Sequence, residues 1–157
     1  MEQAAKPRSG RAGVELAPAA TRRNLEIRTA QDADIPAIVD LARRGYPGQL
    51  PYSTGQIRGQ INAFPEGQFV VTYDGQIVGY AATFIIAEKL ALSDHSWDAI
   101  TGGGFAARHD ADGDWLYGME VCVDSSRRRL RIGQRLYDAR KRLCQDLGLK
   151  GIAFGGR

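Results

Sequence analysis

The chain has 157 residues, of which 43% are hydrophobic and 25% are charged, and its formal net charge is +3. This length fits one domain with a single core, and so small a charge does not by itself indicate a nucleic-acid-binding protein. Two cysteines are too few for a disulfide framework, and no apolar run is long enough for a membrane span. We therefore expect a cytoplasmic protein with no metal site and no nucleic-acid or membrane partner.

The N-terminal segment, residues 1–24, lacks hydrophobic periodicity and is rich in alanine, arginine, glycine and proline. This composition predicts a disordered extension, so we expect the folded domain to span residues 25–157. A basic, alanine-rich start is also compatible with an organelle transit peptide, although Glu2 and Glu15 argue against it.

Two helices are expected after a short opening strand. Alternating side chains predict the strand over residues 24–28. Asp32 and Asp34 then favour a helix start, because acidic groups stabilise the first turn. The apolar residues that follow have helical spacing: Ile35, Ile38, Val39 and Ala42. Ser53 and Gln56 have the spacing of a capping box and predict the start of the second helix.

The second half of the sequence is predicted to contain a hairpin, a long loop and a strand–helix–strand unit. Asp74-Gly75 separates the β-rich runs 68–73 and 76–86, which is a strong hairpin signal. The polar, glycine-rich segment 93–113 predicts a long loop. This order of elements predicts an α/β (α+β) domain with a mixed sheet and packed helices. The remaining elements are expected at 115–123 (strand), 132–147 (helix) and 151–154 (strand).

The most informative segment is 121–136, where an apolar strand leads into an arginine-dense loop and then into a helix. A helix start exposes unpaired N–H groups and the positive end of the helix dipole, which suits an anion. Arg127, Arg128, Arg129 and Arg131 lie in the same turn. The pattern predicts an anionic, phosphorylated ligand, and a solvated basic turn is the alternative.

In this segment and in its order of elements the chain resembles the GNAT superfamily of acetyl-CoA-dependent N-acetyltransferases. The acyl-CoA loop of that family, (Arg/Gln)-x-x-Gly-x-(Gly/Ala), corresponds to residues 128–133. Arg128 and Gly133 fit this pattern, whereas Arg131 replaces the middle glycine. The chain also resembles the acetyltransferase-like domain that precedes a carbon–nitrogen hydrolase (nitrilase) domain in some bacterial proteins, where arginine is usual at this position. The segments that carry this second likeness are 95–102, 109–121 and 154–157.

The resemblance implies a GNAT-like mixed, largely antiparallel sheet with helices on both faces. It also implies that the C-terminal strands are missing, because the family continues past the strand at Ile152 with a helix and two more strands. An incomplete sheet would expose an apolar edge, which favours association. A homodimer, or a covalently attached nitrilase-like domain in a longer parent protein, is therefore expected.

The resemblance also implies roles for individual residues. Backbone N–H groups of residues 130–134 would bind the pyrophosphate of acetyl-CoA, the expected cosubstrate, and the strand before the loop would pair with its pantetheine arm. Glu120 would be the catalytic base for the substrate amine, unless it is a strand-end carboxylate paired with an arginine, and a backbone N–H near Val123 would bind the oxyanion. The expected cofactor-binding residues are Val121, Cys122, Val123, Arg128, Arg129, Leu130, Arg131, Ile132, Gly133 and Gln134.

Three functions remain open at this stage. The first is an N-acetyltransferase acting on an amine of a small molecule or on a protein N-terminus or lysine. The second is a catalytically silent acyl-CoA-binding module that regulates a larger hydrolase, and the third, nucleic-acid binding, has the least support. His95 and His109 either contact substrate or are solvated loop residues, and Cys122 is more consistent with a buried thiol than with a nucleophile.

Overall fold

The computed structural model describes residues 24–49 and 52–155, so the predicted N-terminal extension, apart from residue 24, lies outside the described residues. The strands are β1 (Leu25–Thr29), β2 (Phe69–Tyr73), β3 (Gln76–Ile86), β4 (Trp115–Val123) and β5 (Gly151–Phe154). The α-helices are α1 (Ile35–Gly45), α2 (Thr54–Ala63), α3 (Glu88–Ala91), α4 (Trp97–Thr101) and α5 (Ile132–Asp146). Short 3-10 segments occupy Asp32–Asp34, Pro65–Gly67 and Ser125–Leu130.

The described strands form one sheet in the order β1-β2-β3-β4-β5. Neighbours from β1 to β4 are antiparallel, whereas β5 runs parallel to β4 and is reached through α5. Asp74 and Gly75 form the predicted hairpin turn, and both have positive φ, as a type I′ turn requires. The mixed, largely antiparallel sheet predicted from the sequence is confirmed.

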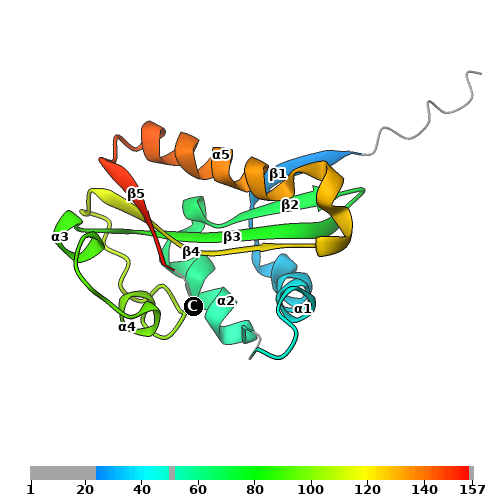
Figure 1. The fold of residues 1–157 in the computed structure, drawn as a ribbon, viewed down its shortest axis with the longest axis horizontal. Coiled ribbons are helices and arrows are strands. Elements are labelled where there is room, and N and C mark those ends of the chain that lie inside the picture. The colour runs from blue at the N-terminus through cyan, green and yellow to red at the C-terminus, as the bar shows by residue number, and fades with distance from the viewer. Residues whose placement is uncertain (1–23, 50–51, 156–157) are drawn as a thin grey trace, which may run out of the picture.

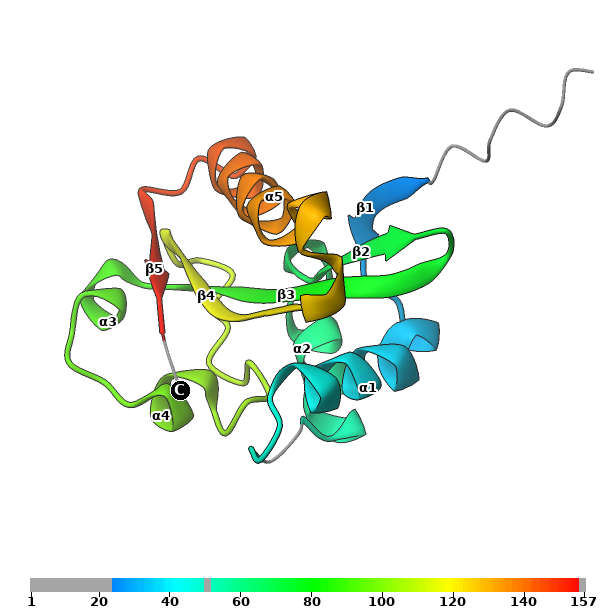
Figure 2. The same ribbon diagram turned by 45° about the vertical axis from the view of Figure 1, so that its right-hand side comes forward.

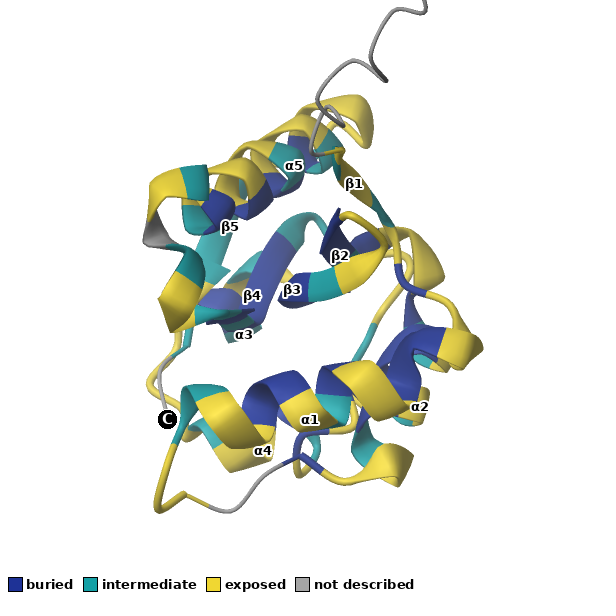
Figure 3. Ribbon diagram, turned by 90° about the vertical axis from the view of Figure 1, so that its right-hand side faces the viewer, coloured by how far each residue is buried: buried dark blue, intermediate teal, exposed yellow. Residues whose placement is uncertain are grey.

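Helices cover both faces of the sheet (Figure 1). Helix α5 lies on one face, and α1 and α2 lie on the other, with their buried sides turned toward the strands (Figure 3). The larger core lies under α1 and α2, and a smaller core under α5 includes Val71, Ala81, Ile132 and Leu136. The capping box predicted for the start of α2 is present: the Ser53 hydroxyl accepts from Gln56 N, and the Gln56 side chain accepts from Ser53 N.

β4 changes its pairing halfway along its length, and this change positions the site. Its register with β3 shifts between Ala82 and Thr83, which leaves Met119 as the extra residue of a β-bulge. On its other side, β5 pairs only with Trp115–Gly118. β5 ends at Phe154, opposite Gly118, and its direction departs from that of β4 (Figure 2). The second half of β4 therefore has a backbone edge that faces away from β3 and is not paired with β5.

The segment 93–113 was predicted to be a long loop, and the structure corrects this by placing α4 within it. Ser96 caps α4 by accepting a hydrogen bond from Ala99 N, and Gly102 ends it in the left-handed region. Trp97 anchors the helix, because its indole Nε1 donates to Met119 O (3.0 Å). A helix of five residues is too short to show hydrophobic periodicity, so the pattern of the sequence could not reveal it.

Candidate functional site

A cavity of about 470 Å³ opens where β4 and β5 diverge. It reaches both faces of the sheet, since its lining includes Tyr46 from the α1 side and Tyr137 and Arg140 from α5. Between them lie β4 residues 118–121 and the end of β5. Such a passage would let two reactants meet from opposite faces of the sheet.

Glu120 is the acidic side chain that lines this cavity. It is 9% exposed and lies on the α1–α2 face, opposite Val121, as alternation along the strand predicted. Tyr46 Oη donates to Glu120 Oε1 (2.8 Å), and Tyr52 Oη donates to Oε2 (2.7 Å). Tyr46 Oη also lies 2.9 Å from Val121 O on β4. Two phenols from the helical face therefore hold the carboxyl group beside the strand edge.

The three β4 residues predicted to pair with pantetheine differ in the direction of their backbone groups. Asp124 N donates to Val78 O on β3, so the alternate residue Cys122 also directs its backbone groups toward β3. Val121 and Val123 then point their N–H and C=O groups to the opposite edge. Cys122 packs its thiol against α1, within 3.6 Å of Leu41 O, which agrees with a buried core thiol.

The loop after β4 has the backbone shape that a glycine would favour. Arg131 occupies the position of the family's middle glycine and has φ +52° and ψ +42°, in the left-handed region. It is also the N-cap of α5, and no side chain caps this end of the helix. The N–H groups of the first turn thus remain available to an anion. A hollow of about 190 Å³ beside them is lined by Val123, Asp124, Arg127, Arg131, Ile132 and Gly133.

Gly133 leaves open space beside that turn, because a Cβ built there meets nothing within 4 Å. Arg129 is exposed, and Arg135 donates to Leu130 O (3.1 Å), which ties the helix to the loop. Gln134 bonds to Asp138 one turn along α5 (2.9 Å). The side chain of Arg128 lies outside what the structure describes. The predicted cofactor-binding residues therefore lie along the second half of β4 and the start of α5. That they bind the cofactor is a proposal.

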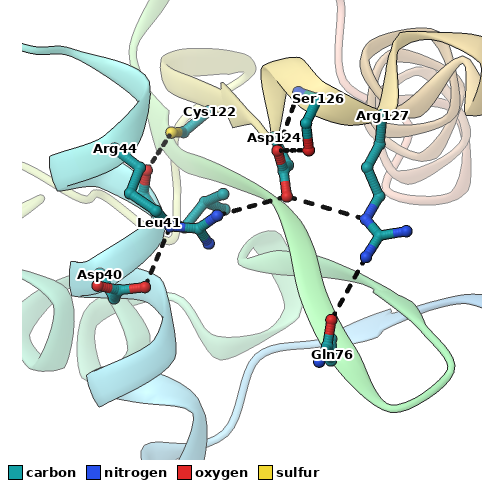
Figure 4. A network of polar contacts seen from close by, with 8 residues as sticks. All are labelled: Asp40, Leu41, Arg44, Gln76, Cys122, Asp124, Ser126 and Arg127. Carbon is teal, nitrogen blue, oxygen red and sulfur yellow. Dashed lines mark hydrogen bonds and ion pairs between the residues drawn. The ribbon is translucent and has the colours of Figure 1, made fainter.

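Asp124 fixes the start of this loop (Figure 4). Its Oδ1 accepts from the backbone N and the hydroxyl of Ser126 (3.0 and 2.7 Å), and its Oδ2 faces Arg44 (3.4 Å) and Arg127 (3.9 Å). The Ser126 hydroxyl, helped by Arg44, lowers the pKa of Asp124 below its usual range. Arg127 also bonds to Gln76 and lies over a tyrosine ring, so its role in this structure is to hold the loop against the hairpin.

Of the two histidines of the segment 93–113, His109 is partly buried and His95 is exposed, and each contacts a neighbouring group. His109 Nδ1 accepts from Ile85 N (3.0 Å), and its ring stacks on Phe64 at 4.7 Å. Burial lowers the pKa of His109 below its usual value. His95 Nε2 lies 3.1 Å from Tyr117 Oη, and burial raises the pKa of that phenol. Within the described residues no cluster of three potential metal ligands occurs.

Reasoning from the sequence missed four residues of the cavity region: Tyr46, Tyr52, Tyr137 and Arg140. The helix prediction gave α5 an apolar stripe ending at Leu147, but Leu147 is 46% exposed and Arg140 is buried instead. One signal was present, since Arg140 continues the four-residue spacing of Ile132 and Leu136. The tyrosines carried no such signal, because their convergence on Glu120 depends on segments about 70 residues apart in the chain.

Comparison with known proteins agrees with this geometry. Residues 35–155 match the acetyltransferase (GNAT) family, and the chain therefore belongs to this family, whose members use acyl-CoA. The predicted membership is confirmed. Within the described residues, no helix combines the length and the apolar character needed to cross a membrane.

Two relatives come from Bacillus subtilis (strain 168). The probable hydrolase YhcX is 38% identical over 135 residues, which cover 86% of this chain and 26% of YhcX. The uncharacterized N-acetyltransferase YkwB is 29% identical over 137 residues, which cover 85% of this chain and 61% of YkwB. The chain thus spans about a quarter of one relative and about three fifths of the other.

Among solved structures, the GNAT-like decarboxylase GphF in complex with isobutyryl-CoA is similar with a TM-score of 0.62 and 26% identity. The match covers 73% of this chain and 56% of GphF. This match shows that the helices and strands of the two proteins are arranged alike, in addition to the similarity of their sequences.

Proposed function

We propose that this chain is an acetyl-CoA-dependent N-acetyltransferase that acylates an amine of a small molecule or a protein. The observation that carries the proposal is the cavity between β4 and β5, which brings the Glu120 carboxyl group to the outward edge of β4. Family membership supports acyl transfer, and the name of YkwB supports an amine acceptor.

The cosubstrate would lie along the outward edge of β4. Its pyrophosphate would bind the first-turn N–H groups of α5, beside the hollow lined by Arg131 and Gly133. Its pantetheine arm would take the place of a paired strand and bond to Val121 and Val123. The thioester would then enter the cavity near residues 118–121. This is a single continuous path from the loop to Glu120.

Acyl transfer needs a base for the ammonium and a donor for the oxyanion. Glu120 would accept the proton of the amine entering from the α1–α2 face, either directly or through Tyr46, whose hydroxyl bonds to it. The outward N–H of Val121 would stabilise the oxyanion, because it borders the cavity whereas Val123 does not. The amine nitrogen then bonds to the carbonyl carbon, the C–S bond breaks, and the leaving CoA thiolate takes up the proton that the attacking nitrogen loses.

The test is calorimetric titration with acetyl-CoA, followed by measurement of thiol release with a panel of amines. Glu120→Gln should lower the turnover rate by about 10²- to 10⁴-fold without loss of acetyl-CoA binding. Glu88→Gln, at a partly exposed acid on α3 outside the cavity, is the matched control and should keep full activity. Failure of the unmodified chain to bind acetyl-CoA would refute the proposal.

A catalytically silent acyl-CoA-binding module is the second candidate. The observation in its favour is that the chain matches only 26% of YhcX, a protein named as a probable hydrolase. A parent protein of that kind would carry a hydrolase, such as a nitrilase-like domain, beside this one. Acetyl-CoA binding without thiol release for any amine would favour this candidate, whereas turnover with an amine would reject it.

A further inference from the structure

The cavity between β4 and β5 has a buried cation on its α5 side. Arg140 is 1% exposed and lines the cavity. Its Nη2 donates to Ala82 O (3.1 Å) and to Glu120 O, two carbonyls beside the β-bulge. Neither Nε nor Nη1 forms a hydrogen bond within the described residues, and Nε is fully buried. Part of the guanidinium's donor capacity is therefore unused.

No ion pair of the described residues includes Arg140, and the charge of Glu120 acts on it only from a longer distance. The Glu120 carboxyl group is held on the other face of the sheet by Tyr46 and Tyr52. Burial lowers the pKa of Arg140 to about 10, so the guanidinium is still charged at neutral pH. Burial of a charge without a partner is unfavourable, and an anion in the cavity would offset that cost.

A glycine and two aromatic rings surround this cation in the cavity wall. A Cβ at Gly118 would lie 2.9 Å from Arg140 Nη1 and 2.8 Å from the Phe154 ring, so the absence of a side chain there lets the guanidinium and the ring pack against the strand. Phe154 stacks on Tyr137 at 5.1 Å and lies 5.7 Å from the guanidinium. Both rings are partly exposed, Phe154 by 48% and Tyr137 by 37%, so this side of the cavity is open to an entering ligand.

The position of the cation relative to the proposed CoA path indicates which part of the donor it meets. Val123 borders the hollow beside the loop, and Gly118 borders the cavity. They are five residue steps apart along the strand, about 16 Å. The phosphates would lie at the loop end of β4, so the group delivered to Arg140 is the acyl group.

We propose that Arg140 selects acyl-CoA donors whose acyl group ends in a carboxylate, such as malonyl or succinyl thioesters. A carboxylate can accept a charge-assisted hydrogen bond from the unused N–H groups and supply the missing counter-charge. This inference rests on the acyl transfer of the proposed function, because it assumes that an acyl-CoA occupies the cavity, and it replaces acetyl-CoA as the preferred donor.

The test begins with the unmodified chain and matched donors. Succinyl-CoA is compared with butyryl-CoA, and malonyl-CoA with propionyl-CoA, so that a carboxylate replaces a methyl group at constant chain length. The carboxylate donors should bind at least about tenfold more tightly by calorimetry. Equal affinities within each pair would overturn this inference alone, whereas no binding of any acyl-CoA would overturn the proposed function as well.

Variants then assign the preference to Arg140. Arg140→Met should abolish it and leave the affinity for butyryl-CoA within about twofold, whereas Arg140→Lys, which keeps the charge, should retain part of it. Arg142→Met, at an exposed position of the same helix, is the control and should keep the full preference. If Arg140→Met weakens all donors equally, the guanidinium serves their common part and the proposal is wrong. Because Arg140 also bonds to strand carbonyls, the donor pairs on the unmodified chain decide the question if this variant does not fold.

Discussion

Replacing Arg131 by glycine tests whether the acyl-CoA loop stores backbone strain. The residue has φ +52°, a conformation that costs a side-chain-bearing residue about 1–2 kcal/mol. Glycine relieves that cost but loses about 0.4–1 kcal/mol through the greater freedom of the unfolded chain. Because the relief is larger than the loss, Arg131→Gly should stabilise the protein by about 0.5–1 kcal/mol and raise Tm by about 2–4 °C.

The matched control is Arg129→Gly, two residues earlier in the same loop. Arg129 is exposed and does not have positive φ, so glycine brings only the entropic cost there, about 0.5–1 kcal/mol of destabilisation. Urea unfolding followed by circular dichroism, with equal slopes in denaturant, measures both variants. Opposite signs are expected, and a loss of stability in both variants would refute the argument from φ.

The same substitution separates stability from binding. Arg131→Gly removes a cation from the hollow at the start of α5. If the guanidinium contacts the CoA phosphates, the affinity for acetyl-CoA should fall although the folded state becomes more stable, and the loss should be about 1.5–3 kcal/mol. An affinity that stays the same or rises would mean that the backbone N–H groups bind the phosphate without this side chain.

Three further predictions concern residues that support the site and the fold. Tyr52→Phe removes a 2.7 Å hydrogen bond to Glu120 and should lower the free energy of unfolding by about 1–3 kcal/mol in urea titrations; no change would mean that the phenol does not hold the carboxyl group. Burial lowers the pKa of His109, so the unfolded chain takes up a proton at a higher pH than the folded protein does. The free energy of unfolding should therefore fall as the pH drops below about 6.5. His109→Gln should remove this pH dependence when unfolding curves at pH 7.5 and 5.5 are compared. Arg28 lowers the pKa of Asp34, so the stability from this pair is present above the ordinary pKa of 3.8 and is lost as the pH falls toward the lowered one. Asp34→Asn should flatten acid unfolding below about pH 4, and an unchanged acid limb would contradict the pairing.

The elements that carry the cofactor path were predictable because their signals are local. The alternation of β4, the Asp74-Gly75 turn and the spacing of Ile132 and Leu136 follow from contacts within a few residues. The anion-binding character of the loop follows likewise from a strand, a group of arginines and a helix start in consecutive sequence. Arg131 in place of glycine could be noticed in the sequence, but its φ of +52° was visible only in the folded backbone.

The sequence by itself thus determined the order of the strands and of α1, α2 and α5, the family and the place of the acyl-CoA loop, since each depends on neighbouring residues. The tertiary structure decided which side chains meet. Tyr46 and Tyr52 reach Glu120 only because α1 and α2 pack on that face of the sheet. Arg140 is buried because α5 lies over the β-bulge, where two strand carbonyls accept its hydrogen bonds. Such contacts join segments distant in the chain. Residue spacing can indicate that Arg140 lies on the inner face of α5, but it does not reveal which residues of other segments meet it.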